Sequence, residues 1–206
     1  MKARSRTPGS SKSVPRGFRN ALLRLLCLAG ITGFRLGSDA AVLPIEVWAR
    51  TNWFYPTALV VDPPGNVIVT GTRYTAETRD DIVTIKYSPA GEPLWTNRFN
   101  GLTHQTDRPS AIGADTNGDI IITGDTYRGN AGYYDFVTIK YSRLGVPLWT
   151  NYYDHTNLFD QAIALAVAPN GDVVVTGNSS GFGTSSDFAT IRYSSSGIQL
   201  WVSRYN

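Results

Sequence analysis

The chain has 206 residues, of which 42% are hydrophobic and 17% are charged, and its formal net charge is +3. Residues 1–40 hold eight Lys or Arg and one Asp, whereas the remainder holds eleven basic and fifteen acidic residues, a net charge of −4. The basic balance therefore belongs to the first 40 residues and is no argument for nucleic-acid binding. The single cysteine, Cys27, rules out an internal disulfide.

Residues 1–40 have the pattern of a secretory signal peptide. A basic run precedes a mainly apolar stretch at 25–34, and small residues at 38 and 40 allow cleavage after Ala40. The apolar stretch is too short to span a bilayer comfortably. The alternative is a disordered basic tail. The signal-peptide interpretation predicts a secreted, cell-surface or periplasmic protein that has no membrane span after cleavage.

Residues 41–55 contain one strand-like pattern without neighbours of its own. Residues 47–50, Val-Trp-Ala-Arg, resemble Leu-Trp-Thr-Asn at 94–97 further along the chain. We expect this segment to be a closing strand, the last strand of a missing blade, or a linker.

Residues 56–206 hold three copies of one repeat, at about 56–100, 110–154 and 161–206. The pair Thr-Gly begins at residues 70, 123 and 176, which gives a period of 53 residues. Each copy then contains a stretch such as Asp135-Phe-Val-Thr-Ile-Lys-Tyr-Ser142 and ends in a Leu-Trp pair. Repeats of this length are typical of solenoid and propeller proteins.

Each copy predicts four β-strands. Two short apolar runs are joined by Gly-Asn or Gly-Asp, as in a tight hairpin, and should be buried on both faces. The third strand alternates, with Val137, Ile139 and Tyr141 on one face, and the fourth carries the Trp. Four strands in about 50 residues make one β-propeller blade. The predicted fold class is therefore all-β, with propeller blades of four antiparallel strands.

Three blades are fewer than the four to eight of a closed ring. We therefore expect an open arc, a fragment of a larger ring, or a half-ring that pairs with another copy. Uncovered outer blade faces favour self-association.

The copies resemble the SBBP-type β-propeller repeat of bacteria. The resemblance rests on the Asp-Pro-x-Gly-Asn hairpin, the Val-Thr-Gly strand end, the Asp-Phe-x-Thr-Ile-Lys-Tyr-Ser strand and the Gly-x-x-Leu-Trp strand. It covers about residues 56–206. It implies a propeller fold and an exported bacterial protein, and it implies no particular reaction or ligand.

Few residues suggest catalysis or metal binding. His104 and His155 lie between blades, where solvated polar residues are the simpler interpretation, and no metalloprotease or nucleophile-elbow motif is present. The loop 115–119, Asp-Thr-Asn-Gly-Asp, alternates oxygen ligands but lacks the twelfth-position Glu of a calcium loop, so a hairpin explains it equally well. Gly181-Phe182-Gly183 lacks the pattern of a phosphate loop. We expect no cofactor, no metal and no catalytic residue.

Two residue types recur in every blade and should serve the blade itself. We expect Asp81, Asp135 and Asp187 to accept backbone N–H bonds at a strand start. A functional ring of carboxylates is the alternative. Trp95, Trp149 and Trp201 are placed alike in each blade and should be packing residues.

The longer connections define the candidate binding surface. In a four-stranded blade, the connections 73–80, 127–134 and 179–186 should share one face of the ring with those at 101–109 and 155–160; we call it the long-loop face. Binding groups gather on such loops, and the predicted ligand-binding residues there are Tyr74, Tyr127, Arg128, Tyr133, Tyr134, Phe159 and Phe182. Aromatics folded back over the blade tops are the alternative. A protein or glycan partner suits exposed aromatics.

The leading functional interpretation is an exported, non-catalytic propeller module for binding or scaffolding. The alternative is the propeller domain of a secreted enzyme of the lyase or hydrolase type. An enzyme would need a convergent set of acid, base or metal residues outside the repeat pattern, and none stands out in the sequence.

Overall fold

A computed structural model describes residues 54–129, 133–156, 158–181 and 183–205. The predicted signal peptide, most of the segment 41–55, and Phe182 lie outside these residues. The described residues form twelve strands in three four-stranded antiparallel sheets. They include no helix that is long and apolar enough to cross a membrane. The predicted all-β fold class is confirmed, and the three sheets form an open arc of propeller-type blades.

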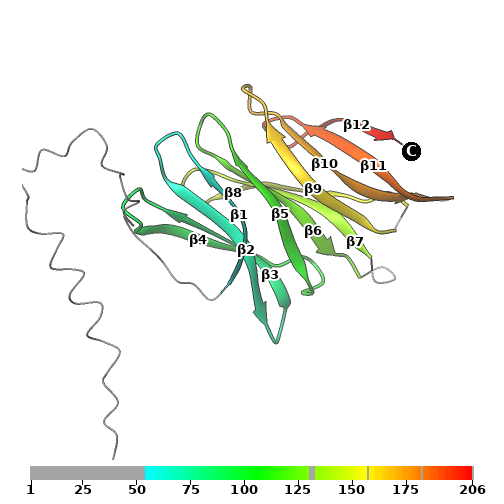
Figure 1. Cartoon of the computed structure of the whole chain (residues 1–206), viewed down its shortest axis with the longest axis horizontal. Helices are drawn as coiled ribbons and strands as arrows, with labels where there is room; N and C mark the ends of the chain where they lie inside the picture. The colour runs from blue at the N-terminus through cyan, green and yellow to red at the C-terminus, as the bar shows by residue number, and fades with distance from the viewer. Residues whose placement is uncertain (1–53, 130–132, 157, 182, 206) are drawn as a thin grey trace, which may run out of the picture. The chain divides into compact units, whose positions relative to one another are not determined.

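The sheets follow one another along the chain (Figure 1). Blade 1 holds β1 (Tyr55–Val61), β2 (Val67–Thr75), β3 (Arg79–Tyr87) and β4 (Pro93–Phe99). Blade 2 holds β5 (Asp107–Ala114), β6 (Ile120–Tyr127), β7 (Tyr134–Tyr141) and β8 (Pro147–Tyr153). Blade 3 holds β9 (Asp160–Val167), β10 (Val173–Gly181), β11 (Thr184–Tyr193) and β12 (Gln199–Tyr205). The first strands of neighbouring blades contact each other, β1 with β5 and β5 with β9.

The Thr-Gly signature marks a close approach of two strands. A Cβ added to Gly71, Gly124 or Gly177 would lie 2.1, 1.9 or 2.0 Å from a carbonyl oxygen of the preceding strand. The first strand is irregular at this point in every blade, between Pro56 and Ala58 in blade 1. Only glycine fits there, which explains why the pair recurs with the blade period.

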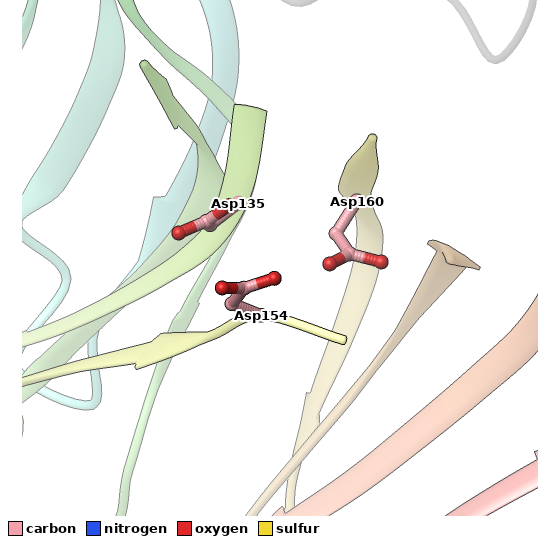
Figure 2. A group of neighbouring side chains, drawn as sticks. All are labelled: Asp135, Asp154 and Asp160. Carbon is pink, nitrogen blue, oxygen red and sulfur yellow. The ribbon is translucent and has the colours of Figure 1, made fainter. Parts of the chain in front are cut away.

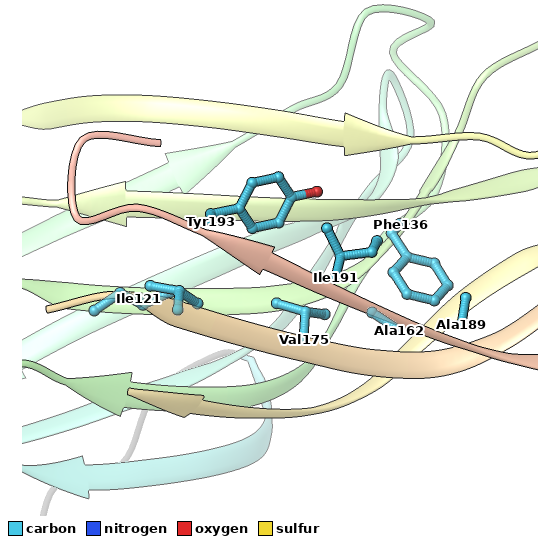
Figure 3. Packing of buried hydrophobic residues seen from close by; sticks show 8 residues of the cluster. Ile121, Phe136, Ala162, Val175, Ala189, Ile191 and Tyr193 are labelled. Atoms are coloured by element: carbon cyan, nitrogen blue, oxygen red, sulfur yellow. The ribbon is translucent and has the colours of Figure 1, made fainter. Parts of the chain in front are cut away.

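The core includes two layers, one on each side of blade 2, and a third cluster of Val83, Ile85 and Tyr87 in blade 1. Ile120 and Ile122 of β6 pack with Ile68 of blade 1, whereas Ile121 belongs to a cluster with Val175 and other residues of blade 3 (Figure 3). Both faces of β6 are therefore buried, as its continuous apolar run predicts. The alternating pattern of β7 also lies between two neighbours, so both of its faces are buried.

The outer blades differ from blade 2 because each has a neighbour on one side only among the described residues. In β1, Leu59 is 65% exposed and Val61 is 56% exposed, so the expectation of a strand buried on both faces is wrong there. In β12, Leu200 and Trp201 are exposed as well. The outer faces of the arc thus present large apolar side chains to solvent.

The connections divide into two faces, but not all of the predicted long loops are loops. Turns at 62–66, 88–92, 115–119, 142–146, 168–172 and 194–198 form what we call the short-loop face. On the long-loop face, β2 and β3 remain paired out to Thr75 and Arg79, and β10 and β11 out to Gly181 and Thr184. The expectation of long loops at 73–80 and 179–186 is therefore wrong, because these residues form extended hairpins. The connections 100–106 and 154–159 between blades are true loops.

Candidate functional site

On the short-loop face, the turns between the third and fourth strands of blades 2 and 3 dock on the preceding blade. The indole Nε1 of Trp95 donates to the carbonyl oxygen of Arg143 at 3.1 Å, and the Asn97 amide donates to that of Gly145 at 2.7 Å. Lys86 also donates to the Arg143 carbonyl oxygen at 3.1 Å. Side chains of blade 1 therefore bind main-chain oxygens of blade 2.

The same arrangement joins blades 2 and 3. Trp149 donates to the carbonyl oxygen of Ser195 at 3.2 Å, and Asn151 donates to that of Gly197 at 2.7 Å. Gly197 has a φ of +86°, and an added Cβ would lie 2.7 Å from the Trp149 ring. Trp95 and Trp149 are thus packing residues, as predicted, and they lie between blades, where each requires a glycine against its ring.

Beneath these contacts lie buried ion pairs. Lys86 Nζ is 2.7 Å from Asp62 Oδ2, and Lys140 Nζ is 2.8 Å from Asp115 Oδ2. Burial alone would raise the pKa of Asp62, but hydrogen bonds from Lys86 and Asn66 outweigh it and hold that pKa below its ordinary value. Asp115 Oδ1 accepts from the backbone N–H groups of residues 117 and 119 at 2.9 and 3.0 Å. The loop 115–119 is therefore a hairpin whose first carboxylate is bound by a lysine.

A pocket of about 410 Å³ opens between blades 1 and 2 on this face. Its walls include Leu94, Trp95 and Leu144, with Asp62 and Lys86 at its base. Sequence reasoning did not anticipate it, because it combines turns more than 70 residues apart. Its charged pair recurs in blade 2, which favours a role in the blade rather than in a reaction.

On the long-loop face, three of the predicted ligand-binding residues come together. The Tyr127 and Tyr134 rings pack edge to face with their centroids 5.5 Å apart. Tyr134 and Phe159 pack in the same way with their centroids 6.1 Å apart. The guanidinium of Arg108 lies 5.9 Å from the Tyr134 ring centre. A smaller pocket of about 170 Å³ adjoins them, lined by Arg79, Gln105, Thr106, Tyr127 and Tyr134. We call Tyr127, Tyr134 and Phe159 the aromatic cluster.

The other predicted residues are placed differently. Tyr74 is 64% exposed near the end of β2, and Tyr133 is half-buried just before β7. Arg128 faces inward: its Nε lies 3.2 Å from Asp135 Oδ2, and its guanidinium stacks 4.4 Å above the ring of Tyr152. The structure therefore assigns Arg128 to the junction between strands rather than to an exposed binding surface.

Each recurring aspartate pairs with an arginine, which comes from the fourth strand in blades 1 and 3. Arg98 donates from Nε and Nη2 to Asp81 Oδ2 at 2.8 and 2.5 Å, and Arg204 donates to Asp187 Oδ2 at 2.7 Å. The sequence predicts backbone donors for these carboxylates, whereas the structure supplies fourth-strand guanidinium groups. Blade 2 has no arginine at this position, and its Asp135 lies near Asp154 and Asp160 (Figure 2).

One further carboxyl group is unusually buried between blades 1 and 2. Asp107 accepts from the Thr126 hydroxyl at 2.5 Å and from the Gly101 N–H at 2.6 Å. Burial raises the pKa of Asp107 to about 6 despite these two donors. The Asp107 carboxyl group holds the loop 100–106 against β6.

The two histidines lie at different junctions. His104 has a φ of +51° and its Nδ1 is 2.8 Å from the amide nitrogen of Asn100. The backbone N–H of His155 donates to Asp160 Oδ2 at 2.8 Å. Neither contact brings a histidine ring to a carboxylate.

Comparison with known proteins finds similarity to a repeat protein but shows no family. No family model matches the sequence. An uncharacterised WD repeat-containing protein of Acanthamoeba polyphaga mimivirus is 28% identical over 155 residues, which cover 58% of this chain and 11% of that protein. Among solved structures, one described as the eukaryotic initiation factor has a TM-score of 0.49 at 6% identity, over 79% of this chain and 34% of that chain. The resemblance to the SBBP repeat stays a prediction.

Proposed function

We propose that this chain is a non-catalytic binding module of the propeller type, which holds a protein partner on its long-loop face. The observation that carries this proposal is the aromatic cluster beside the pocket lined by Arg79 and Gln105. Tyrosine and arginine contribute most at the centres of protein interfaces, where rings supply contact area at little cost in conformational entropy.

The cluster is suited to binding because it is preorganised. The edge-to-face contacts fix the ring of Tyr134 between those of Tyr127 and Phe159, so little side-chain freedom remains to be lost on association. Phe159 is 39% exposed and Arg108 is half-exposed, only 3.5 Å from Asp80 in a solvated ion pair. We therefore infer a partner segment that combines an apolar or aromatic side chain with a carboxylate, which replaces Asp80 as the partner of Arg108.

A displayed peptide library screened against the full chain tests this proposal. For the peptides recovered, Tyr134→Ala and Phe159→Ala should each weaken the dissociation constant at least tenfold. Asn117→Ala on the short-loop face and Tyr205→Ala on the exposed edge of blade 3 serve as controls that leave affinity unchanged. Loss of binding in Asn117→Ala, with full binding in both cluster variants, would place the site on the opposite face.

We also propose that the chain is exported by residues 1–40 and that its repeats belong to the SBBP type. The support is the order of a basic run, an apolar stretch and a small-residue site, together with the repeat motifs. Amino-terminal sequencing of secreted protein should begin near Ala41. Recovery of only the uncut chain from the cytoplasm would contradict export.

We further propose self-association through the outer face of blade 3. Trp201 pairs with Arg192 in the register in which Trp149 pairs with Lys140, yet Trp201 is 42% exposed. A tryptophan in this position docks on the turn of another blade within the chain, so a second copy can supply that turn. Light scattering should show a concentration-dependent mass that falls to the monomer in Trp201→Glu. A monomeric wild-type chain at all concentrations would contradict the proposal.

A further inference from the structure

The junction between blades 2 and 3 departs from the repeat in its charges. The residue opposite the third strand is Arg98 in blade 1 and Arg204 in blade 3, where each neutralises the aspartate of its own blade. In blade 2 the same register position is Tyr152, which pairs with Val137. Asp135 therefore lacks a fourth-strand cation, and its arginine partner is Arg128 from the connection after β6.

A second departure adds a negative charge at the same place. The residue that follows the fourth strand by one position is Asn100 after blade 1 and Asp154 after blade 2. Asp160, at the start of β9, corresponds to Asp107 at the start of β5. The junction between blades 2 and 3 thus has three aspartates where the earlier junction has two aspartates, an asparagine and an arginine.

The three carboxylates face a common space. One oxygen from each of Asp135, Asp154 and Asp160 lies within 4.8 Å of the others. Figure 2 shows the Asp154 carboxylate between the other two, with an oxygen of Asp160 directed toward it. Asp135 and Asp160 are buried, whereas Asp154 is exposed, so the group is open to solvent on one side.

Asp160 supplies a second observation that points to a ligand. Its side chain is fully buried, and its Oδ2 accepts from the His155 N–H at 2.8 Å. Its Oδ1 is also buried but has no hydrogen-bond partner among the described residues. A buried oxygen without a donor costs free energy, and a cation placed among the carboxylates removes that cost.

Two arginines lie near the group. Arg128 Nε is 3.2 Å from Asp135 Oδ2, and the charge of Arg204, which pairs with Asp187, also acts on Asp160. Carboxylate oxygens within 4.8 Å of one another repel when ionised, and a divalent cation placed among them would relieve that repulsion.

We propose that Asp135, Asp154 and Asp160 form a calcium-binding site that joins blade 2 to blade 3. Ca²⁺ binds carboxylate oxygens at 2.3–2.6 Å, so two oxygens on opposite sides of the ion are about 5 Å apart, which accommodates three oxygens within 4.8 Å. Water reaches the site past Asp154 and completes the coordination. The donor set contains no nitrogen or sulfur, which disfavours zinc.

Calcium at this position would complement the docking on the opposite face. Trp149 and Asn151 hold the two blades together at the short-loop face, whereas the aspartates lie at the ends of β7, β8 and β9 on the long-loop face. The site is independent of the partner-binding proposal, because Phe159 and the other rings contribute no ligand.

Titration of the metal-free full chain with CaCl₂ tests the site. Calorimetry should show one ion bound per chain, and thermal unfolding should shift upward with CaCl₂. Asp154→Asn, an isosteric change at an exposed residue, should weaken Ca²⁺ binding at least tenfold, and Asp160→Asn should do the same. Asp119→Asn on the short-loop face is the matched control and should bind as the wild type does.

A variant that restores the repeat gives an independent readout. Tyr152→Arg introduces the guanidinium that blades 1 and 3 have, so it should remove most of the response to CaCl₂, although it also removes the ring on which Arg128 stacks. The proposal is overturned if 10 mM CaCl₂ gives the wild type no heat of binding and no thermal shift, or if Asp154→Asn responds like Asp119→Asn. An equal response to MgCl₂ would overturn the assignment to calcium.

Discussion

The contact between Gly197 and Trp149 predicts how strongly the turns hold the blades together. Gly197→Ala adds a methyl group to a residue at a φ of +86°, at 2.7 Å from Cγ and 2.8 Å from Cδ2 of the Trp149 ring. The left-handed backbone costs alanine about 1 kcal/mol, and forcing the methyl group against the ring costs about 1 to 3 kcal/mol more. The expected loss in the free energy of unfolding is therefore about 2 to 4 kcal/mol.

Gly118→Ala is the matched control for backbone strain. Gly118 has a φ of +79° in an equivalent tight turn, but an added Cβ would meet nothing closer than 3.7 Å. Its expected loss is only the backbone cost of about 1 kcal/mol. Equilibrium urea unfolding, followed by tryptophan fluorescence and circular dichroism, measures both variants.

A double-mutant cycle identifies the origin of the difference. In a Trp149→Ala background the ring is gone, so Gly197→Ala should cost no more than Gly118→Ala does in the wild type. If the two glycine variants lose equal stability in the wild type, to within about 0.5 kcal/mol, the packing argument is refuted. The same follows if the excess cost of Gly197→Ala persists without the ring.

The other predictions concern buried charges. Lys140→Met should cost about 3 to 5 kcal/mol, because it leaves Asp115 buried without its cation. Arg192→Met should cost much less, because its ion pair with Asp172 is partly exposed to solvent. Equal losses in chemical denaturation would contradict this. The pKa of Asp107 is raised in the folded chain from 3.8 to about 6, so the carboxylate form destabilises the fold. Relative to Asp107→Asn, the wild type should therefore lose at most about 3 kcal/mol of unfolding free energy as pH rises from 4 to 7, and parallel pH profiles would contradict the assignment.

The strands were predictable from the sequence because each blade repeats the same constraints. The Thr-Gly pair recurs where two strands approach too closely for any side chain, and the Leu-Trp pair recurs where a fourth strand docks on the next turn. Because the pattern occurs three times, the residues that recur in it can be recognised as structural requirements. The hairpin of β2 and β3 was missed because its tip, 76–78, and its flanking residues are polar and lack a strand pattern.

The candidate sites were less predictable because they depend on residues that differ between the three repeats. Tyr127, Tyr134 and Phe159 were all expected on the long-loop face, but their mutual packing depends on the path of the loop 154–159. The three aspartates come from three segments, and each has a plain structural explanation on its own. Aligning the repeats provides the missing signal, since Tyr152 and Asp154 are departures from the pattern.

The docking of each blade on its neighbour uses main-chain acceptors, and this has an evolutionary consequence. Trp95 binds the carbonyl oxygen of Arg143, and Trp149 binds that of Ser195, so the side chain at the accepting position is immaterial. A duplicated gene segment encoding one blade would carry both halves of the joint, the donating tryptophan and the accepting turn. Blades can thus be added or exchanged in a single genetic event, and the side chains at Arg143 and Ser195 remain free to diversify afterwards, whereas the glycine against each ring has to stay.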